Sequence, residues 1–423
     1  MALQATICTG CSLLCDDVEV EVKDGEVLKV MAACSHGVKR MKEVVKARPL
    51  KPAVVDGGSI RELSLDEALE RACELLKSSR SPLIYGGSCS SNRAVELMIK
   101  LAEKLGGVYD APSSVCHLTL NLDSSLLEAR LDEILEDADF IFYWASDPSD
   151  THLRHASRYA VFPRGRSVPM GRESRVVAVM DVKETGTMKI AQHKLIVKPG
   201  EDAKLASALE SLVLGGTLGF DRVAGVSLEE LSSTARDMSR ASYIAIFVGR
   251  GLLSTDKPKE AMDSIARLAK VLLGLGKKVS IIPMAEHVNS MGQALITKKL
   301  KGAPRAIDFS SPEGRASLEV TANWALEHKK VDAALIIKGG GLEDLTSTAI
   351  EELSRIPAIA LEEEESKAFH AATVRVPAAV TGVESGGAVT RMDGVEVELK
   401  PIMRPPDTVA VEEEFLDRLV QML

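Results

Sequence analysis

Residues 8–37 read CTGCSLLCDDVEVEVKDGEVLKVMAACSHG, and the rest of the chain is organised around this stretch. It holds four of the seven cysteines, in the spacing C-x2-C-x3-C-x18-C: Cys8, Cys11, Cys15 and Cys34. Thiols this close in sequence converge when a metal centre binds them, and thiolates are soft ligands that suit iron–sulfur clusters or zinc. Asp24-Gly25 between alternating apolar and polar residues predicts a hairpin, which returns Cys34 to the first three cysteines.

The cysteine spacing favours a 4Fe–4S cluster, with zinc and disulfides as the alternatives. Zinc sites usually pair two C-x2-C knuckles, and the second knuckle is missing here. Lys39 and Lys42 follow Cys34 closely. Solvated surface residues are the favoured interpretation; the alternative is a cation beside the cluster that tunes its potential or bridges to a second cofactor.

The composition indicates a protein of several domains and narrows the classes of partner. A chain of 423 residues is too long for one core, so two or three domains are expected. The net charge is −9, and no basic patch with interleaved aromatic residues is present, so we expect no nucleic-acid partner. The sequence has no apolar leader and no apolar run of about 18 residues, so we expect no membrane partner and a cytoplasmic location.

Four apolar runs each lead through a short loop toward a helix. These units span residues 82–92, 140–148, 243–251 and 333–341. They predict parallel sheets that bind ligands at the carboxyl ends of their strands, where backbone N–H groups meet phosphates. None of them carries a full G-x-G-x-x-G, so an ordinary NAD site is not supported.

Several polar residues follow apolar runs at positions that suit a ligand. Asp181 ends such a run and can accept hydrogen bonds from a ribose or a base, whereas Asp202 can be a helix cap and nothing more. His152 and His155 lie three residues apart at a helix start, beside Arg154 and a second arginine. A shared metal face is one interpretation, and a basic rim around an anion is favoured because of the arginines.

The pair Cys116-His117 lies in a polar loop after a short apolar segment. A buried loop thiol is the simplest interpretation. A cysteine nucleophile is the second, although the sequence signatures of that class are absent. The third is a thiolate ligand of a metal with an acid/base group beside it.

Taken together, these segments resemble the B subunits of formylmethanofuran dehydrogenases, which are tungsten- or molybdenum-dependent members of the molybdopterin-dinucleotide oxidoreductases. The resemblance runs essentially end to end. It rests on five motifs, at residues 8–34, 114–117, 144–159, 181–202 and 382–394.

The resemblance implies roles for individual residues. The four cysteines of residues 8–34 would hold a 4Fe–4S cluster, and Cys116 would ligate the tungsten or molybdenum of a bis-molybdopterin guanine dinucleotide. His117 and His287 would complete the catalytic set with Cys116. The implied cofactor-binding residues are Gly86, Asp147, His152, Arg154, His155, Asp181, Asp202, Gly249 and Glu384.

The resemblance also implies a reaction and partners. The family joins reduction of CO2 to formate with condensation of formate onto methanofuran, and the B subunit carries the redox half. We therefore expect a complex with the A, C and D subunits and with ferredoxin-type electron carriers. Single-chain members of the superfamily carry a further C-terminal pterin-binding domain, which this family supplies as a separate chain, the D subunit. The chain stops at Leu423, so we expect it to lack that domain and to act only in the complex.

The sequence departs from the family pattern at Leu118, where glycine is usual, at Leu153, where proline is usual, and, most seriously, just before His287. Where the family places an arginine just before a Gly-His pair, this chain has Ala285-Glu286-His287. An arginine would hold formate or CO2 by charge-assisted hydrogen bonds, and Ala285 cannot. Two alternatives follow from this change: a bis-pterin oxidoreductase subunit for another small substrate, and an electron-transfer or structural paralogue without a working metal site.

We therefore expect an α/β fold with a small N-terminal 4Fe–4S domain and two parallel-sheet domains, similar to molybdopterin oxidoreductases. The cluster domain is expected at 1–55, and a discontinuous α/β domain at 56–135 and 305–380. An inserted, dinucleotide-binding-like α/β domain is expected at 136–304, and a segment returning to the cluster domain at 381–423.

Overall fold

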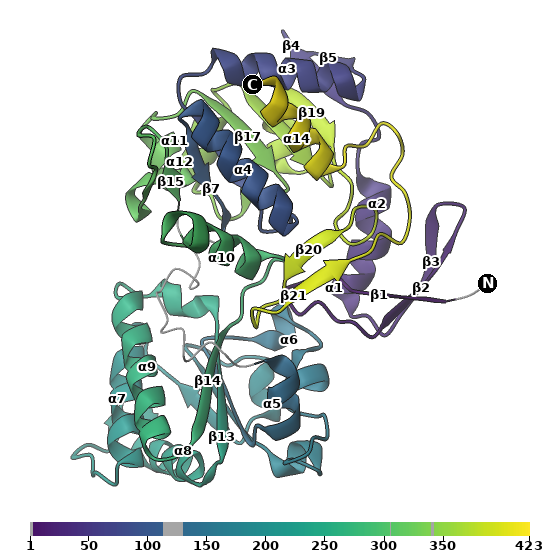
Figure 1. Ribbon diagram of the computed structural model, residues 1–423. Coiled ribbons are helices and arrows are strands. Elements are labelled where there is room, and N and C mark those ends of the chain that lie inside the picture. Colours follow the sequence, from purple (N-terminus) through teal and green to yellow (C-terminus); the bar gives the residue numbers. More distant parts are fainter. Residues whose placement is uncertain (1–2, 113–129, 305, 340–341) are drawn as a thin grey trace. The chain divides into compact units, whose positions relative to one another are not determined.

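The computed structural model describes residues 3–112, 130–304, 306–339 and 342–423 (Figure 1). The chain folds into two compact units. The first comprises Met1–Val115, His287–Arg391 and Glu396–Leu423, and the second comprises Cys116–Glu286 and Met392–Val395. The expected cluster domain lies within the first unit, and the expected inserted domain overlaps most of the second.

The N-terminal segment of the first unit forms a small antiparallel sheet followed by a helical stretch. Its strands are β1 (Gln4–Thr6), β2 (Val18–Lys23) and β3 (Glu26–Met31). Asp24 and Gly25 have φ of 51° and 76°, the left-handed conformation that a two-residue hairpin turn requires, so the predicted hairpin is confirmed. The helical stretch consists of α1 (Ser35–Val38), the π-helical η1 (Lys39–Glu43) and α2 (Val44–Ala47).

A larger sheet forms the centre of the first unit. Within the described residues its strand order is β16 (Arg315–Ala316), β15 (Ile307–Asp308), β7 (Val108–Asp110), β6 (Pro82–Gly86), β17 (Ala333–Ile337), β18 (Ala358–Glu362), β19 (Val374–Pro377), β4 (Ala53–Asp56) and β5 (Ser59–Glu62). The central strands from β7 to β19 run parallel, and antiparallel pairs extend both edges. The prediction of a parallel sheet is confirmed.

Helices cover both faces of this sheet, which explains why its strands are continuous apolar runs. One face packs against α3 (Leu65–Ser78), α4 (Asn92–Leu105) and α14 (Glu412–Met422). The other packs against α11 (Ala322–Glu327), α12 (Ser347–Leu353) and α13 (Lys367–Ala371). The sequence Ser64-Leu65-Asp66-Glu67, followed by apolar residues at helical spacing, predicts a helix start, and Ser64 and Glu67 form a capping box that starts α3.

Within the described ranges, the second unit contains a parallel five-stranded sheet. Its order is β10 (His193–Ile196), β9 (Val176–Asp181), β8 (Phe140–Trp144), β13 (Tyr243–Val248) and β14 (Lys278–Pro283). Strand order runs one way from β8 to β10 and the other way from β13 to β14, so a topological switch point lies between β8 and β13. Such a point is where open parallel sheets bind ligands.

Helices flank the sheet of the second unit as well (Figure 1). One face packs against α7 (Asp202–Val213), α8 (Leu228–Arg240) and α9 (Pro258–Gly274). The remaining elements that the described residues form are α5 (Leu131–Asp137), α6 (Pro148–Thr151), η5 (Ala156–Ala160), η6 (Gly171–Ser174), η7 (Thr187–Ile190), β11 (Arg222–Val223), β12 (Val226–Ser227), η8 (Arg250–Ser254), α10 (Ser290–Lys301), η9 (Leu318–Val320), β20 (Gly387–Thr390) and β21 (Glu396–Leu399). No helix in the described ranges has the length and apolarity needed to cross a bilayer.

Candidate functional site

The four cysteines of the N-terminal motif lie together in the first unit, and we call them the cysteine site: Cys8, Cys11, Cys15 and Cys34. The N–H of Cys8 donates to the carbonyl of Cys15 at 2.9 Å and closes the loop between them. The pKa of the Cys11 thiol is raised, chiefly because the side chain is buried. The electrostatic interaction of Cys11 with the other three thiols adds to this rise. Four thiolates at one such site need a cationic centre to neutralise them, and an iron–sulfur cluster provides one.

The described cysteines form neither disulfides nor a ready-made site for a single metal ion. None of the six described cysteines forms a disulfide. No three His, Cys, Asp or Glu side chains in the described part of the chain are placed to share one metal ion. As they stand, the four thiols therefore do not surround a single zinc ion.

Two glycines pack against the sulfur of Cys8. The N–H of Gly10 donates to Cys8 Sγ at 3.4 Å. A Cβ on Gly37 would lie 2.7 Å from the same sulfur, and a Cβ on Gly10 would lie 2.8 Å from the backbone nitrogen of Gly37. Hydrogen bonds to sulfur help to set the potential of iron–sulfur clusters. The sequence analysis did not single out Gly37, because its crowding arises only when α1 folds against the loop.

Arg40 is a cation on the helical stretch that follows Cys34. Its guanidinium binds both carboxylate oxygens of Glu363, with Nη2–Oε1 at 2.8 Å. Lys39 is exposed, and Lys42 donates to the carbonyl of Leu28 at 3.0 Å. The sequence analysis missed Arg40 because its partner comes from a strand end 323 residues away.

The loop after β6 brings Cys89 next to His287. Cys89 Sγ lies 3.9 Å from Nδ1 of His287, and Nε2 of His287 lies 3.7 Å from Oδ2 of Asp344. Burial opposes charge on the imidazole, but hydrogen bonds and charge interactions with Asp344 and Cys89 prevail and raise the pKa of His287 to about 10. The side chain keeps 31% of its surface exposed, so a charged imidazolium is available to an acidic or anionic group.

Two other residues expected at the cofactor have structural partners in the first unit. Gly86 has a φ of 136°, and a Cβ on it would lie 1.9 Å from the carbonyl oxygen of Ile337. Only glycine therefore allows β6 to pass β17 at this point. Glu384 accepts from both Nη atoms of Arg48, with Nη2–Oε1 at 2.6 Å, and from the N–H of Val380 at 3.0 Å. Contacts of either residue with a cofactor stay a prediction.

A cavity of about 520 Å³ lies at the switch point of the second unit. The loops that follow β8, β9, β13 and β14 all contribute to its wall. A Cβ on Gly249 would lie 2.1 Å from the carbonyl oxygen of Ala145, so only glycine lets these two loops pass so closely. Ala145 itself has a φ of 48°, an unusual conformation for a residue with a side chain. The cavity is large enough for part of a nucleotide.

Three of the expected aspartates line this cavity. Asp202 accepts from Nε1 of Trp144 at 3.0 Å, and Asp181 accepts from the N–H of Val182 at 2.8 Å. Burial chiefly raises the pKa of both carboxyl groups. Asp147 caps α6 and also binds Thr187; burial opposes its ionisation, but the hydrogen bonds from Ser149, Thr187 and Gly186 lower its pKa.

His152 and His155 are fully buried inside the second unit. Nε2 of His152 lies 3.0 Å from the carbonyl oxygen of Ala285, and Nδ1 of His155 lies 2.9 Å from the hydroxyl of Tyr143. Burial, with a smaller contribution from His152, lowers the pKa of His155 well below its usual value, so this ring is neutral. Arg154 beside them is partly exposed. Direct contact of these three side chains with a cofactor stays a prediction.

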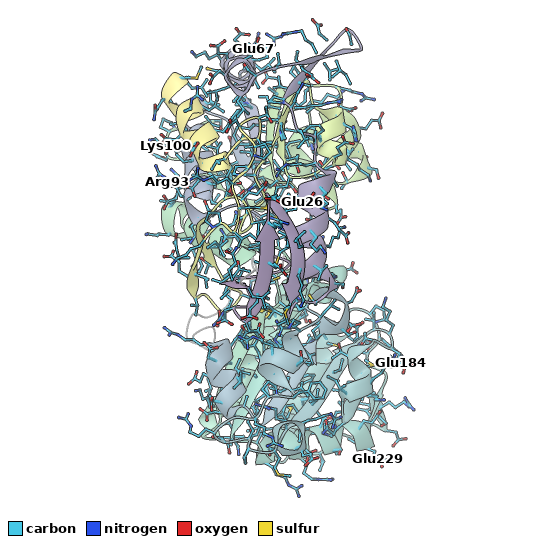
Figure 2. All side chains as sticks on the ribbon, turned by 90° about the vertical axis from the view of Figure 1, so that its right-hand side faces the viewer. Glu26, Glu67, Arg93, Lys100, Glu184 and Glu229 are labelled. Carbon is cyan, nitrogen blue, oxygen red and sulfur yellow. The ribbon has the colours of Figure 1, made fainter. Side chains whose placement is uncertain are left out.

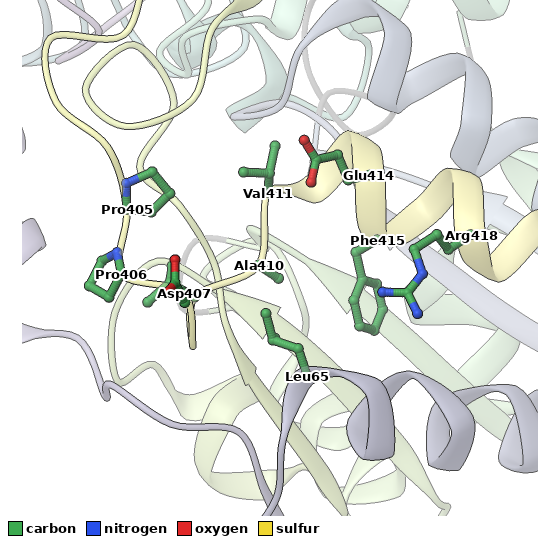
Figure 3. Close-up of a pocket in the computed structure, with 10 residues that line it drawn as sticks. Leu65, Pro405, Pro406, Asp407, Ala410, Val411, Glu414, Phe415 and Arg418 are labelled. Atoms are coloured by element: carbon green, nitrogen blue, oxygen red, sulfur yellow. The ribbon is translucent and has the colours of Figure 1, made fainter.

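The remaining expected site residues, Cys116 and His117, lie outside the described residues. A separate cavity of about 280 Å³ lies in the first unit between the start of α3 and α14 (Figure 3). Leu65, Pro406, Phe415 and Arg418 are among the residues that line it. The described residues around it include none of the expected site residues.

Known proteins share this architecture. The similarity to acetylene hydratase from Pelobacter acetylenicus covers 99% of this chain and 69% of that one, with a TM-score of 0.75 and 14% identity. The similarity to a chain of the formyltransferase/hydrolase complex from Methylorubrum extorquens, solved with methylofuran, covers 87% of this chain and 98% of that one, with a TM-score of 0.67 and 19% identity. No family model matches the chain.

One curated relative is similar to this chain in sequence over nearly its whole length. The chain is 31% identical over 422 residues to the B subunit of tungsten-containing formylmethanofuran dehydrogenase 2 from Methanocaldococcus jannaschii, covering 98% of this chain and 97% of that protein. The parallel sheets, the switch-point cavity and this relationship define the class, a subunit of an α/β oxidoreductase. Within that class, the chain belongs to the B subunits of formylmethanofuran dehydrogenases.

Proposed function

We propose that this chain is the redox subunit of a formylmethanofuran dehydrogenase complex, which reversibly reduces CO2 to formate for formylation of methanofuran. The observation that carries the proposal is the convergence of four thiols in the cysteine site, in a chain of this family. We assign a 4Fe–4S cluster to these cysteines and a bis-molybdopterin guanine dinucleotide with tungsten or molybdenum to the chain. The bound groups would supply two-electron chemistry at carbon and one-electron transfer.

The cavity of the second unit fits the guanine nucleotide of such a cofactor. Asp181 and Asp202 present carboxylates to it, and a guanine offers N–H donors that carboxylates accept well. Backbone of the loops after β8 and β13 approaches closely at Ala145 and Gly249, which leaves room for phosphates. We assign this cavity to one nucleotide arm.

We assign proton handling near the substrate to His287. Its imidazolium can donate a hydrogen bond to a carboxylate or hold a proton that moves with the electrons. Asp344 keeps the ring charged, and Cys89 contacts its other nitrogen. Cys116 as the metal ligand and His117 as acid/base stay predictions.

The composition of the purified complex tests this proposal. The chain would be purified anaerobically with the subunits encoded beside it, and iron, tungsten, molybdenum and pterin-bound guanine nucleotide would be measured per protomer. Iron, one heavy metal and guanine nucleotide in the ratio about 4:1:2, together with formate-dependent dye reduction, support the proposal. Iron without heavy metal or nucleotide would reduce the chain to an electron carrier.

Ala285 favours a second candidate, an oxidoreductase subunit for another small substrate. Ala285 is buried, and its carbonyl oxygen lies 3.0 Å from Nε2 of His152. It brings no charge to hold a carboxylate. A complex loaded with metal and pterin that fails to oxidise formate but reduces a different small oxidised substrate would select this candidate.

Gly37→Ala should strongly impair assembly of the cluster. The added Cβ would lie 2.7 Å from Cys8 Sγ, and the helix backbone and the loop would have to separate. We expect at least about a tenfold loss of bound iron, measured by iron content and by the electron paramagnetic resonance (EPR) signal of the reduced complex. Gly219→Ala is the matched control, because a Cβ there meets nothing within 4 Å. Full iron loading of Gly37→Ala would contradict the assigned geometry.

Asp181→Asn should weaken retention of the guanine nucleotide by about 10- to 100-fold, the loss expected for one charge-assisted hydrogen bond. The measurement is the guanine nucleotide that remains on the complex after extensive dialysis. Glu184→Gln is the control, since Glu184 is exposed on the second unit and does not line the cavity (Figure 2). Equal retention in Asp181→Asn and the control would show that this carboxylate does not bind the nucleotide.

A further inference from the structure

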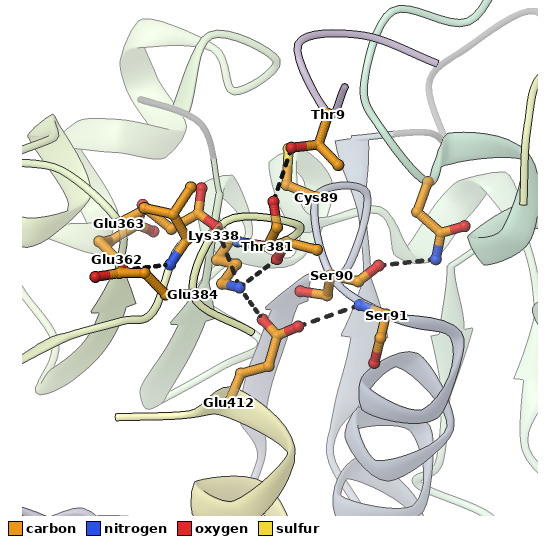
Figure 4. A network of polar contacts seen from close by, with 12 residues as sticks. Thr9, Cys89, Ser90, Ser91, Lys338, Glu362, Glu363, Thr381, Glu384 and Glu412 are labelled. Atoms are coloured by element: carbon orange, nitrogen blue, oxygen red, sulfur yellow. Dashed lines mark hydrogen bonds and ion pairs between the residues drawn. The ribbon is translucent and has the colours of Figure 1, made fainter. Parts of the chain in front are cut away.

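A buried polar network in the first unit connects the cysteine site with the carboxyl end of the large sheet (Figure 4). Thr9, between Cys8 and Gly10, donates from its hydroxyl to the carbonyl of Thr381 at 2.7 Å. The two segments touch closely, because a Cβ on Gly382 would lie 2.4 Å from Cγ2 of Thr9. The loop that carries three of the cysteines is therefore in direct contact with this network.

The network contains two cations and two anions in direct contact. Lys338 Nζ lies 3.1 Å from Glu363 and 2.6 Å from Glu412, and it donates to the hydroxyl of Thr381. Arg40 pairs with Glu363 from the helical stretch that follows Cys34. The Lys338 side chain is 1% exposed, and those of Glu363 and Glu412 are 7% and 1% exposed. These four charges balance one another.

Glu362 is a fifth ionisable side chain beside these four, and none of the four charges forms an ion pair with it. It is buried at the end of β18, and its Oε1 accepts from the N–H of Gly339 at 2.9 Å. Within the described residues it makes no ion pair. The pKa of Glu362 is raised to about 8, chiefly because the side chain is buried. The nearby carboxylates of Glu363 and Glu364 also raise this pKa, whereas the hydrogen bond from Gly339 and the charge of Lys338 lower it. A carboxyl group in this state changes its protonation near neutral pH.

The other titratable groups around Glu362 are fixed or exposed to solvent. The pKa of Glu363 is held low by Arg40 and Lys338 in spite of its burial. Glu364 is exposed, as are Lys367 and His370 on α13, the helix packed against β18.

We propose that Glu362 is a redox-coupled proton site, which binds one proton when the cluster of the cysteine site accepts one electron from a low-potential electron carrier. This inference rests on the proposed function. The electron adds to the cluster, the proton passes from solvent to the Glu362 carboxylate, and no bond to carbon changes. The cause is electrostatic: a charge added at the cysteine site acts through a buried region of low dielectric on a carboxyl group that, among the described residues, has no cation in contact.

The test is the dependence of the cluster midpoint potential on pH in the full complex, followed by EPR from about pH 6 to 10. The reduced cluster favours the protonated carboxyl, so the potential should fall as pH rises through the pKa of Glu362. In Glu362→Gln the side chain stays neutral. Its potential should be independent of pH and should equal the acid-side plateau of the wild type. Glu364→Gln removes an exposed carboxylate that raises the pKa of Glu362, so it should keep the fall in potential and move that fall to lower pH.

A second measurement needs no variant. Infrared difference spectra of the wild-type complex at pH near the pKa should show a protonated carboxyl band that grows on reduction. A loaded cluster whose potential does not change with pH, or the same pH profile in Glu362→Gln, would overturn this inference alone. A complex without iron would overturn both this inference and the proposed cluster.

Discussion

Lys338→Met should lower the free energy of unfolding of the first unit by about 3–5 kcal/mol, the range measured when one partner of a buried ion pair is removed. The lysine ammonium is 1% exposed and is shared by Glu363 and Glu412. Without it, Glu412 keeps the N–H of Ser91 at 3.1 Å but has lost its cation. Urea denaturation measures the change, with Trp324 fluorescence in a Trp144→Phe background reporting the first unit.

The double variant Lys338→Met/Glu412→Gln is the control for this prediction. A neutral glutamine leaves no uncompensated charge, so a large part of the lost stability should return. Lys329→Met, at an exposed side chain that pairs loosely with Glu352 at 3.8 Å, should change stability by less than about 1 kcal/mol. Equal effects of Lys338→Met and Lys329→Met would show that the buried network does not stabilise the first unit.

His287→Gln should lower formate-dependent dye reduction by about 10²- to 10⁴-fold, the usual contribution of a positioned acid or base. Iron and heavy-metal content should stay unchanged, because the side chain is not an expected ligand of either. Loss of metal together with activity would instead indicate a structural role for the ring.

Asp344→Asn tests the charge of His287 while the imidazole ring itself stays in place. With a pKa of about 10, the imidazolium is fully charged at neutral pH and loses its proton only as the pH rises through 10. Because Asp344 raises this pKa, its removal should move the alkaline limb of the pH–rate profile to lower pH. Charge on His287 stabilises the fold fully below the ordinary histidine pKa of about 6.5, and this contribution disappears as pH rises through the raised value. Glu286→Gln, at an exposed carboxylate next to His287 in the chain, should leave the limb unchanged.

Local sequence signals account for the elements that the sequence analysis placed correctly. Asp24-Gly25 fixes a turn through its own backbone preferences, and Ser64 with Glu67 starts a helix by hydrogen bonds over three residues. The apolar runs at β6, β8, β13 and β17 are strands of parallel sheets, because a strand covered on both faces must be apolar throughout. Each of these signals depends on residues close together in the chain.

The residues that the sequence analysis missed depend on contacts between distant parts of the chain. Arg40 meets Glu363, and Lys338 meets Glu412, only because β17, β18 and α14 converge at the carboxyl end of one sheet. The placement of His155 against Tyr143 inside the second unit has the same origin. A sequence shows that a residue can carry charge, but not what will surround it.

The sequence by itself therefore determined the family, the cysteine motif, the parallel sheets and the place of Asp181 at the end of a strand. These features depend on the types of residue and on their spacing along the chain, both of which can be read from the sequence. Only the tertiary structure decided which charged groups are buried together, which histidine is neutral and which is charged, and that Gly37 must remain a glycine. Burial and electrostatic environment belong to the packed fold, because they arise from groups that the chain brings together only when it folds.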